Sequence, residues 1–123
     1  MTGWEIVSRS KDGFDITDIK TYTGTLMGAP HGVVFYSKYD VLINCIADTD
    51  TYSNDRESDW NVNYKGVATL VNFCNDFNVK LVHISSDYIY SNSISEAAED
   101  DVPMHCGNWY GYTKLLADGH VQN

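Results

Sequence analysis

Leu81-Val82-His83-Ile84-Ser85-Ser86 is an apolar run that ends in two hydroxyl residues, and Trp109-Tyr110-Gly111-Tyr112-Thr113-Lys114 follows it after a polar loop. The apolar run predicts a buried strand over Leu81–Ile84. The second stretch predicts a helix, for which Asn108 is a suitable N-cap. Because Tyr110 and Lys114 are four residues apart, they lie on the same face of that helix, one turn from each other.

This pairing has a chemical use. A phenol with an ordinary pKa near 10 is a poor proton donor at neutral pH unless a nearby cation stabilises its phenolate. Lys114 can supply that cation for Tyr110, and Ser86, at the carboxyl end of the strand, can offer its hydroxyl to the same carbonyl oxygen. The three side chains therefore predict a site for hydride transfer to a carbonyl. The alternative is that the pair decorates a helix surface and that Ser86 only ends a strand.

Strands and helices alternate outward from these two stretches. Val41 to Ala47 is a continuous apolar run, typical of a strand buried on both faces. From Asp59 to Asn75 apolar residues recur at steps of three and four, which predicts an amphipathic helix. We also expect a short strand over Trp4 to Val7 and a weak helix from Asp18 to about Leu26. This alternation predicts an α/β fold, a parallel sheet with helices on both faces.

Other segments are less informative. The stretch from Met27 to Lys38 combines Gly-Ala-Pro-His-Gly, which breaks a helix, with Val33-Val34-Phe35-Tyr36, which favours a strand, and both states stay open. Asn78-Val79-Lys80 is predicted to turn the chain into the strand at Leu81. Ser91 to Asp101 is polar and predicts a loop.

Composition bounds the class of protein. A chain of 123 residues can form one compact domain, and its net charge of −9 argues against a nucleic-acid or acidic-membrane surface, since both need clustered Lys and Arg. No apolar run reaches the length of a membrane span, and the N-terminus lacks the layout of a signal peptide. These features predict a cytoplasmic protein.

The cysteines do not predict a disulfide framework or a metal site. Cys45 lies within an apolar strand and Cys74 on the apolar side of a helix, so both are expected to be buried free thiols. Cys106 stands beside His105, but neighbouring loop residues seldom bind one ion together, and the other histidines are scattered. We therefore expect no metal.

Several motifs together resemble the extended short-chain dehydrogenase/reductases and, within them, the dTDP-4-dehydrorhamnose reductases. The motifs stand in family order and cover nearly the whole chain: Phe14-Asp15-Ile16-Thr17-Asp18, Tyr39-Asp40-Val41-Leu42-Ile43-Asn44-Cys45-Ile46-Ala47, Asn61-Val62-Asn63-Tyr64-Lys65-Gly66, Leu81 to Tyr90 with Ser85-Ser86-Asp87-Tyr88, and Asn108 to Ala117 with Tyr110 and Lys114. The resemblance implies a Rossmann-like fold in which Ser86, Tyr110 and Lys114 are catalytic and Ser86 and Asp87 contact the substrate.

The family opens with a strand and a Gly-rich turn that binds the cofactor pyrophosphate. Here Gly24, Gly28 and Gly32 have the wrong spacing for that turn. The resemblance also implies a sixth strand and a substrate-binding region after the active-site helix. We therefore expect residues 1–123 to form a single partial NAD(P)-binding domain, an incomplete sheet that lacks its first strand and Gly-rich loop.

The cofactor is predicted from the end of the expected strand at Trp4 to Val7, which corresponds to the second strand of the family. Arg9-Ser10-Lys11 offers two cations and a hydroxyl, which suit a 2′-phosphate and favour NADP(H) over NAD(H), although a solvated basic turn is an alternative. The resemblance further implies that Asp15 and Ile16 lie beside the adenine and that Ala47, Asp48 and Thr49 follow the adenosine and ribose, with Tyr110 and Lys114 at the nicotinamide end. Asp15 can equally be a turn cap.

The resemblance implies NAD(P)H-dependent reduction of a 4-keto nucleoside-diphosphate sugar, with the isolated chain expected to be inactive. Two alternatives stay open. One is a nucleotide-sugar epimerase or dehydratase, which shares the Ser, Tyr and Lys set. The other is a catalytically silent remnant that serves as a binding or assembly module. An incomplete sheet also favours a homo-oligomer or a partner chain that completes the fold.

Overall fold

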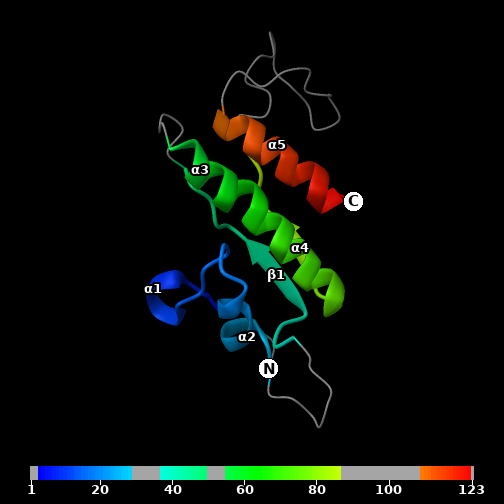
Figure 1. Cartoon of the computed structure of the whole chain (residues 1–123). Helices are drawn as coiled ribbons and strands as arrows, with labels where there is room; N and C mark the ends of the chain where they lie inside the picture. Colours follow the sequence, from blue (N-terminus) through cyan, green and yellow to red (C-terminus); the bar gives the residue numbers. More distant parts are fainter. Residues whose placement is uncertain (1–2, 29–36, 50–54, 87–108, 123) are drawn as a thin grey trace.

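The computed structural model of the chain describes residues 3–28, 37–49, 55–86 and 109–122, and Figure 1 shows their arrangement. The elements are α1 (Arg9–Asp12), α2 (Lys20–Leu26), β1 (Val41–Asn44), α3 (Arg56–Asp59), the π-helix η1 (Trp60–Lys65), α4 (Gly66–Asp76), β2 (Lys80–His83) and α5 (Trp109–Gln122). β1 and β2 pair in parallel. The predicted α/β class is confirmed, with a parallel sheet flanked by helices.

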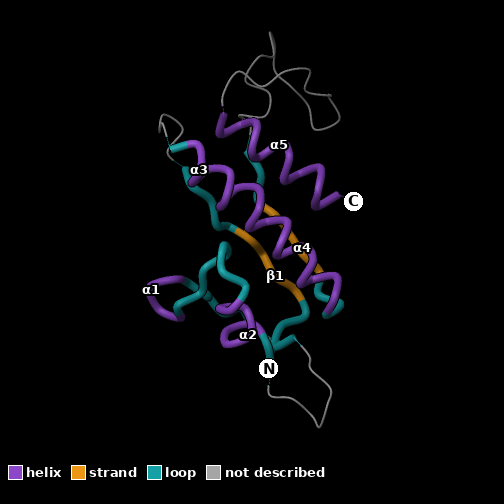
Figure 2. Tube along the Cα trace, viewed as in Figure 1, coloured by secondary structure: helices purple, strands orange, loops and turns teal. Residues whose placement is uncertain are grey.

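The helices cover one face of this sheet. Leu42 pairs with Leu81 on the face that packs against the apolar core, whereas Ile43 pairs with Val82 and these two side chains are 47% and 39% exposed. The prediction that β1 is buried on both faces is therefore wrong for the residues that the structure describes. The apolar core that α2 and α4 share lies on the face that carries Leu42, and among the described residues the face that carries Ile43 stays exposed. In the view of Figure 2, α4 lies to one side of β1, and α1 and α2 lie to the other.

α3, η1 and α4 form one continuous helical segment between the strands. Asp55 caps its start by accepting a hydrogen bond from the backbone N–H of Ser58. In η1 the helix is wider than an α-helix, and the backbone N–H of Gly66 donates to the carbonyl of Asn61, five residues earlier. The segment ends before Asn78, which adopts a left-handed φ of 55° and turns the chain into β2. The amphipathic helix and the turn after it are confirmed, but the π-helical turn was not predicted.

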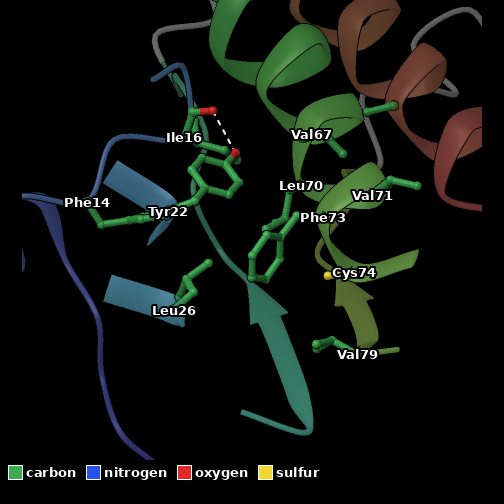
Figure 3. Packing of buried hydrophobic residues seen from close by; sticks show 11 residues of the cluster. Phe14, Ile16, Tyr22, Leu26, Val67, Leu70, Val71, Phe73, Cys74 and Val79 are labelled. Atoms are coloured by element: carbon green, nitrogen blue, oxygen red, sulfur yellow. Dashed lines mark hydrogen bonds between the residues drawn. The ribbon is translucent and has the colours of Figure 1, made fainter. Parts of the chain in front are cut away.

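The apolar core lies between α4 and the N-terminal third of the chain (Figure 3). Tyr22 from α2 meets Phe73 from α4 with their ring centroids 5.7 Å apart, and the Tyr22 hydroxyl donates to the carbonyl of Ile16 at 2.8 Å. Gly66 allows a close approach, because a Cβ there would lie 2.9 Å from Cγ2 of Ile16. Cys74 is buried as predicted, and burial raises the pKa of its thiol to about 11.

The N-terminal segment differs from the prediction. Residues 4–7 form no strand, and Trp4 and Ile6 are 77% and 80% exposed. A strand needs a neighbour for its backbone hydrogen bonds, and no described segment pairs with this one. The short α1 follows, capped by Ser8 and ended by Gly13 at a φ of 70°. The predicted helix up to Leu26 is confirmed as α2.

Two further predictions concern Cys45 and the stretch from Met27 to Lys38. Cys45 is exposed rather than buried, because β1 ends at Asn44 and Cys45 belongs to the irregular segment that follows. Of the open stretch from Met27 to Lys38, residues 29–36 lie outside the described part, and Met27 pairs with Ser37 through an isolated antiparallel bridge. Among the described residues, no helix has the length and apolar character needed to cross a membrane.

Candidate active site at the carboxyl ends of the strands

Part of the predicted set of site residues lies near one edge of the sheet. Because β1 and β2 are parallel, the segments that leave their carboxyl ends begin side by side. Ala47, Asp48 and Thr49 follow β1, and Ser86 follows β2. Open α/β sheets bind their ligands at this edge, so the arrangement suits a ligand site.

Helix α5 brings Lys114 to the end of β2. The side chain is 2% exposed, and its Nζ donates to the carbonyl of Ile84 at 2.9 Å, two residues before Ser86. Burial lowers the pKa of Lys114, whereas the charge of Asp118 raises it. Tyr110 is buried one turn before Lys114 on the same helix. The structure therefore brings Tyr110, Lys114 and the strand end that carries Ser86 into one region.

The remaining residues of this predicted set are placed less fully. Ser86 is half-buried and follows β2 after Ile84 and Ser85. Asp87, the predicted substrate contact, lies outside the described residues, as does Asn108, the predicted N-cap of the helix.

Lys114 belongs to a cluster of polar side chains between α5 and the strands, which we call the α5–β2 polar cluster; its members are Asn44, His83, Ser85, Lys114 and Asp118. Ser85 Oγ donates to Oδ2 of Asp118 at 2.5 Å, and His83 Nε2 lies 4.0 Å from the other carboxylate oxygen. His83 Nδ1 faces the Asn44 amide at 3.2 Å. Burial and then the charge of Lys114 lower the pKa of His83, while Asp118 raises it.

The sequence did not reveal this cluster. Its members come from β1, the end of β2 and α5, so they are far apart in the chain. The one available signal was Asp118, four residues after Lys114 and thus on the same helix face.

The segment after β1 is held by the helix that follows it. Asn63 Oδ1 accepts from the backbone N–H of Asp48 at 2.8 Å, and Asn63 Nδ2 donates to the carbonyl of Asp48 at 3.1 Å. Ser58 Oγ also donates to the Asp48 carboxylate at 2.5 Å. Asn63 is fully buried within η1. Its amide fixes both backbone groups of one predicted cofactor residue, a role that an Asn on a buried helix face could have suggested.

The predicted adenine-end residues lie elsewhere. In Figure 1 α1 is far from α5, so Arg9 and Lys11 are not brought together with Lys114. Arg9 is exposed, with an Nη 3.9 Å from the Asp15 carboxylate, and Lys11 Nζ donates to the carbonyl of Ile6 at 3.1 Å. Ile16 is part of the apolar core, and its carbonyl accepts the hydrogen bond from the Tyr22 hydroxyl, so its predicted contact with the adenine stays a prediction.

Asp15 closes a turn. Its carboxylate accepts from the hydroxyl of Thr17 at 2.7 Å and from the backbone N–H of Thr17 at 2.9 Å. These hydrogen bonds, the hydroxyl first, hold the pKa of Asp15 below its usual value. The turn-cap role that the sequence allowed is thus present, and the adenine contact stays a prediction.

The described residues contain no group of three or more His, Cys, Asp or Glu side chains arranged to hold a metal ion. The His105 and Cys106 pair lies outside the part of the chain that the structure describes.

Comparison with known proteins identifies relatives of this chain in sequence and in fold. Over 95 residues the chain is 33% identical to dTDP-4-dehydrorhamnose reductase of Mycolicibacterium smegmatis, a match that covers 71% of this chain and 28% of that protein. Two crystal structures share the fold. The dTDP-4-dehydrorhamnose reductase of Bacillus anthracis in complex with NADP superposes with a TM-score of 0.71 at 23% identity, over 89% of this chain and 37% of that one. The UDP-glucuronic acid 4-epimerase of Bacillus cereus in complex with NAD has a TM-score of 0.60 at 24% identity, over 66% and 26%.

The chain thus spans about a third or less of the length of these relatives. The family described as RmlD substrate binding domain matches residues 1–123. That match covers every element described above, from α1 to the α5 helix that carries Tyr110 and Lys114, and the chain belongs to this family.

Proposed function

We propose that the chain carries the Ser86, Tyr110 and Lys114 site of an NAD(P)H-dependent reduction of a 4-keto sugar on a nucleoside diphosphate. One observation carries the proposal: α5 delivers the buried Lys114 ammonium to the Ile84 carbonyl, at the strand end that continues into Ser86. A lysine is almost never buried to this degree unless it is paired, and buried ionisable groups cluster at functional sites.

The residues at the sheet edge fit a nicotinamide cofactor. The segment of Ala47, Asp48 and Thr49 leaves β1 at the position where dinucleotides bind in open α/β sheets, and Asn63 holds its backbone in place. Lys114 lies at the neighbouring strand end and would hold the nicotinamide ribose. Such a cofactor, when bound, supplies the hydride. Bound forms of the relatives support this class of ligand, since one contains NADP and another NAD.

The protein side chains would handle the proton and the carbonyl. Tyr110 would donate its phenolic proton to the developing alkoxide, and the Lys114 cation would lower the free-energy cost of the phenolate. Ser86 would donate a hydrogen bond to the same oxygen and orient the ketone. Asp87 would contact the sugar.

NADPH is the preferred cofactor in this proposal. Arg9 is exposed, and Lys11 lies two residues away on the same turn of α1, so a 2′-phosphate could reach two cations. The same cations would also fit a solvated basic turn, in which case NADH would bind as well as NADPH.

Two other functions of the family remain distinct proposals. An epimerase or dehydratase would use the same three side chains on a nucleotide sugar, and the epimerase of Bacillus cereus shares the fold. A silent binding module would keep the fold without turnover. A partner chain or second copy that completes the sheet is compatible with each, since Ile43 and Val82 are exposed.

Calorimetric titration of the 123-residue chain with NADPH, and then with NADH, tests the cofactor part. Binding of NADPH that is lost in an Arg9→Ala, Lys11→Ala double variant would support the preference. Equal binding of both cofactors would remove it. Binding of neither would mean that the isolated chain is an inactive piece of a reductase, since the expected partial domain lacks the Gly-rich turn that binds the pyrophosphate.

Because the isolated chain is expected to be inactive, turnover is tested in a reconstituted protein in which this chain is joined to the remaining segments of its dTDP-4-dehydrorhamnose reductase relative. A dTDP-linked 4-keto sugar is the substrate, and NADPH absorbance is followed. Tyr110→Phe should abolish oxidation of NADPH while leaving cofactor binding intact. Tyr112→Phe is the matched control, because Tyr112 lies on the same helix but is exposed. If Tyr110→Phe turns over as fast as the parent, the catalytic assignment is wrong.

A further inference from the structure

Asp118 connects α5 to the end of β2. It lies one helical turn after Lys114, and its Oδ2 accepts the hydrogen bond from Ser85 Oγ. Its Oδ1 faces the buried His83 Nε2 at 4.0 Å, and that nitrogen makes no hydrogen bond within the described residues. The Asp118 carboxylate thus lies beside both Ser85 and His83, at the end of β2 where Lys114 also binds.

The groups around Lys114 differ in whether they favour its charged form. Among the described residues, Asp118 of α5 and His83 of β2 interact electrostatically with Lys114, Tyr110 lies one turn before it on α5, and Asn44 of β1 is the neutral neighbour of His83. Burial disfavours the charged form of Lys114, and Asp118 is the group that favours it. Without Asp118, a buried ammonium would rely on one carbonyl, that of Ile84, for compensation.

We propose that Asp118 is a positioning residue for Lys114. Its hydrogen bond with Ser85 holds α5 against the residues after β2, so that the Lys114 ammonium stays at the Ile84 carbonyl. The use of this device in catalysis rests on the proposed function, whereas the positioning itself does not.

The test is nuclear magnetic resonance of the 123-residue chain with ¹³C-labelled lysine. Two readouts are followed for Lys114: the pH titration of its ε-methylene resonance, and the nuclear Overhauser contact between that methylene and the α-proton of Ile84. Asp118→Ala removes charge and acceptor together, and Asp118→Asn removes the charge but keeps an acceptor for Ser85. Asp76→Ala, at the exposed end of α4, is the control.

In both Asp118 variants the titration of Lys114 should move to lower pH, because the favourable charge is lost. The Overhauser contact should weaken in Asp118→Ala and persist in Asp118→Asn, and the control should change neither readout. Unchanged titration and contact in Asp118→Ala would overturn the proposal.

If Asp118→Ala does not fold, Ser85→Ala tests the proposal in its place. It removes one exposed hydroxyl and leaves the carboxylate in place, so the contact should weaken without a large change in titration. A contact as strong as in the parent would overturn the proposal. NADPH binding does not enter these readouts, so failure of the proposed function would be visible separately in calorimetry.

Discussion

Helices α4 and α5 both pack beside the sheet, but they bury different kinds of side chain. α4 buries an apolar set that includes Val67, Leu70 and Phe73 against the N-terminal third of the chain. α5 instead buries Thr113 and Lys114 together with Tyr110. Apolar burial stabilises a fold by about 25 cal/mol per Å², whereas a buried charge costs free energy unless it is paired.

The difference indicates what each helix is for. The contacts of α4 follow the rules by which a sequence specifies a stable core. The contacts of α5 break those rules at Lys114, and such local violations occur mainly at functional sites. We therefore expect substitutions in α4 to act chiefly on stability and substitutions at the buried polar positions of α5 to act chiefly on function.

The largest expected effect is at Phe73. Phe73→Ala removes a buried ring that contacts Tyr22 and Phe77, and it should lower the free energy of unfolding by about 3–5 kcal/mol, as measured by urea denaturation. Asn72→Ala, the exposed neighbour on α4, is the control and should change stability little. A small loss in Phe73→Ala would mean that the core collapses readily around the gap.

A smaller loss is expected at Gly66. Its added Cβ would meet Ile16 within 2.9 Å, so Gly66→Ala should lower the free energy of unfolding by about 1–3 kcal/mol through overpacking. Gly24→Ala in α2 is the matched control, because its Cβ would meet nothing within 4 Å. The control should gain about 0.5–1 kcal/mol from helix propensity. Opposite signs in the two variants would confirm the close approach, and equal signs would contradict it.

At Lys114 we expect almost no change in stability. Lys114→Met keeps the length of the side chain and removes the cost of burying a charge. Asp118 keeps its hydrogen bond from Ser85 and is partly exposed, so the free energy of unfolding should stay within about 1 kcal/mol of the parent in urea. This contrasts with Phe73, which is similarly buried. NADPH binding, by contrast, should fall in the calorimeter. A loss of stability as large as that of Phe73→Ala would show that Lys114 is needed to hold α5 against the end of β2.

The smallest effect is a pH dependence at His83. Burial, followed by the charge of Lys114, lowers the pKa of His83 below 6.5, so the unfolded chain binds this proton more readily than the folded one. The free energy of unfolding should therefore rise with pH between that lowered pKa and 6.5, and decline as the pH falls through the same interval.

His83→Gln should flatten the dependence, measured by urea denaturation at a series of pH values. His120→Gln is the control; His120 lies on α5, and its ring faces the ring of Tyr64. Asp15 acts in a more acidic range, since its pKa is held below 3.8, and there stability is lost as the pH falls. A slope that survives in His83→Gln would place its origin in another group.

Local sequence patterns predicted the elements whose stability is local. The spacing of Val67, Val71 and Cys74 specified α4, and the apolar runs located β1 and β2. The predicted strand at residues 4–7 failed because a strand depends on a neighbour that its own sequence cannot indicate. The exposure of Cys45 was missed because the end of β1 is set by pairing with β2, not by the apolar run, which continues to Ala47.

The candidate site was predictable in part. Tyr110 and Lys114 are related by helix periodicity, which a sequence displays directly. The links from Lys114 to Ile84, from Ser85 to Asp118 and from Asn63 to Asp48 join residues that only the packed helices bring together. Distances of this kind depend on how α5 and η1 lie on the sheet, and single-sequence patterns carry no information on that placement.

The widened turn at η1 sets the rotation between the two ends of this helical segment. The helical segment from Arg56 to Asp76 includes one turn that spans five residues instead of four, between Asn61 and Gly66. Removing one residue there would leave a regular α-helix, but would rotate everything before the deletion by about 100° around the axis. Val67 and Phe73 would stay in the core, while Asn63 would swing away from Asp48. The extra residue of the π-helical turn thus sets the angle between two parts of the helix. One part stabilises the domain, and the other holds the segment after β1.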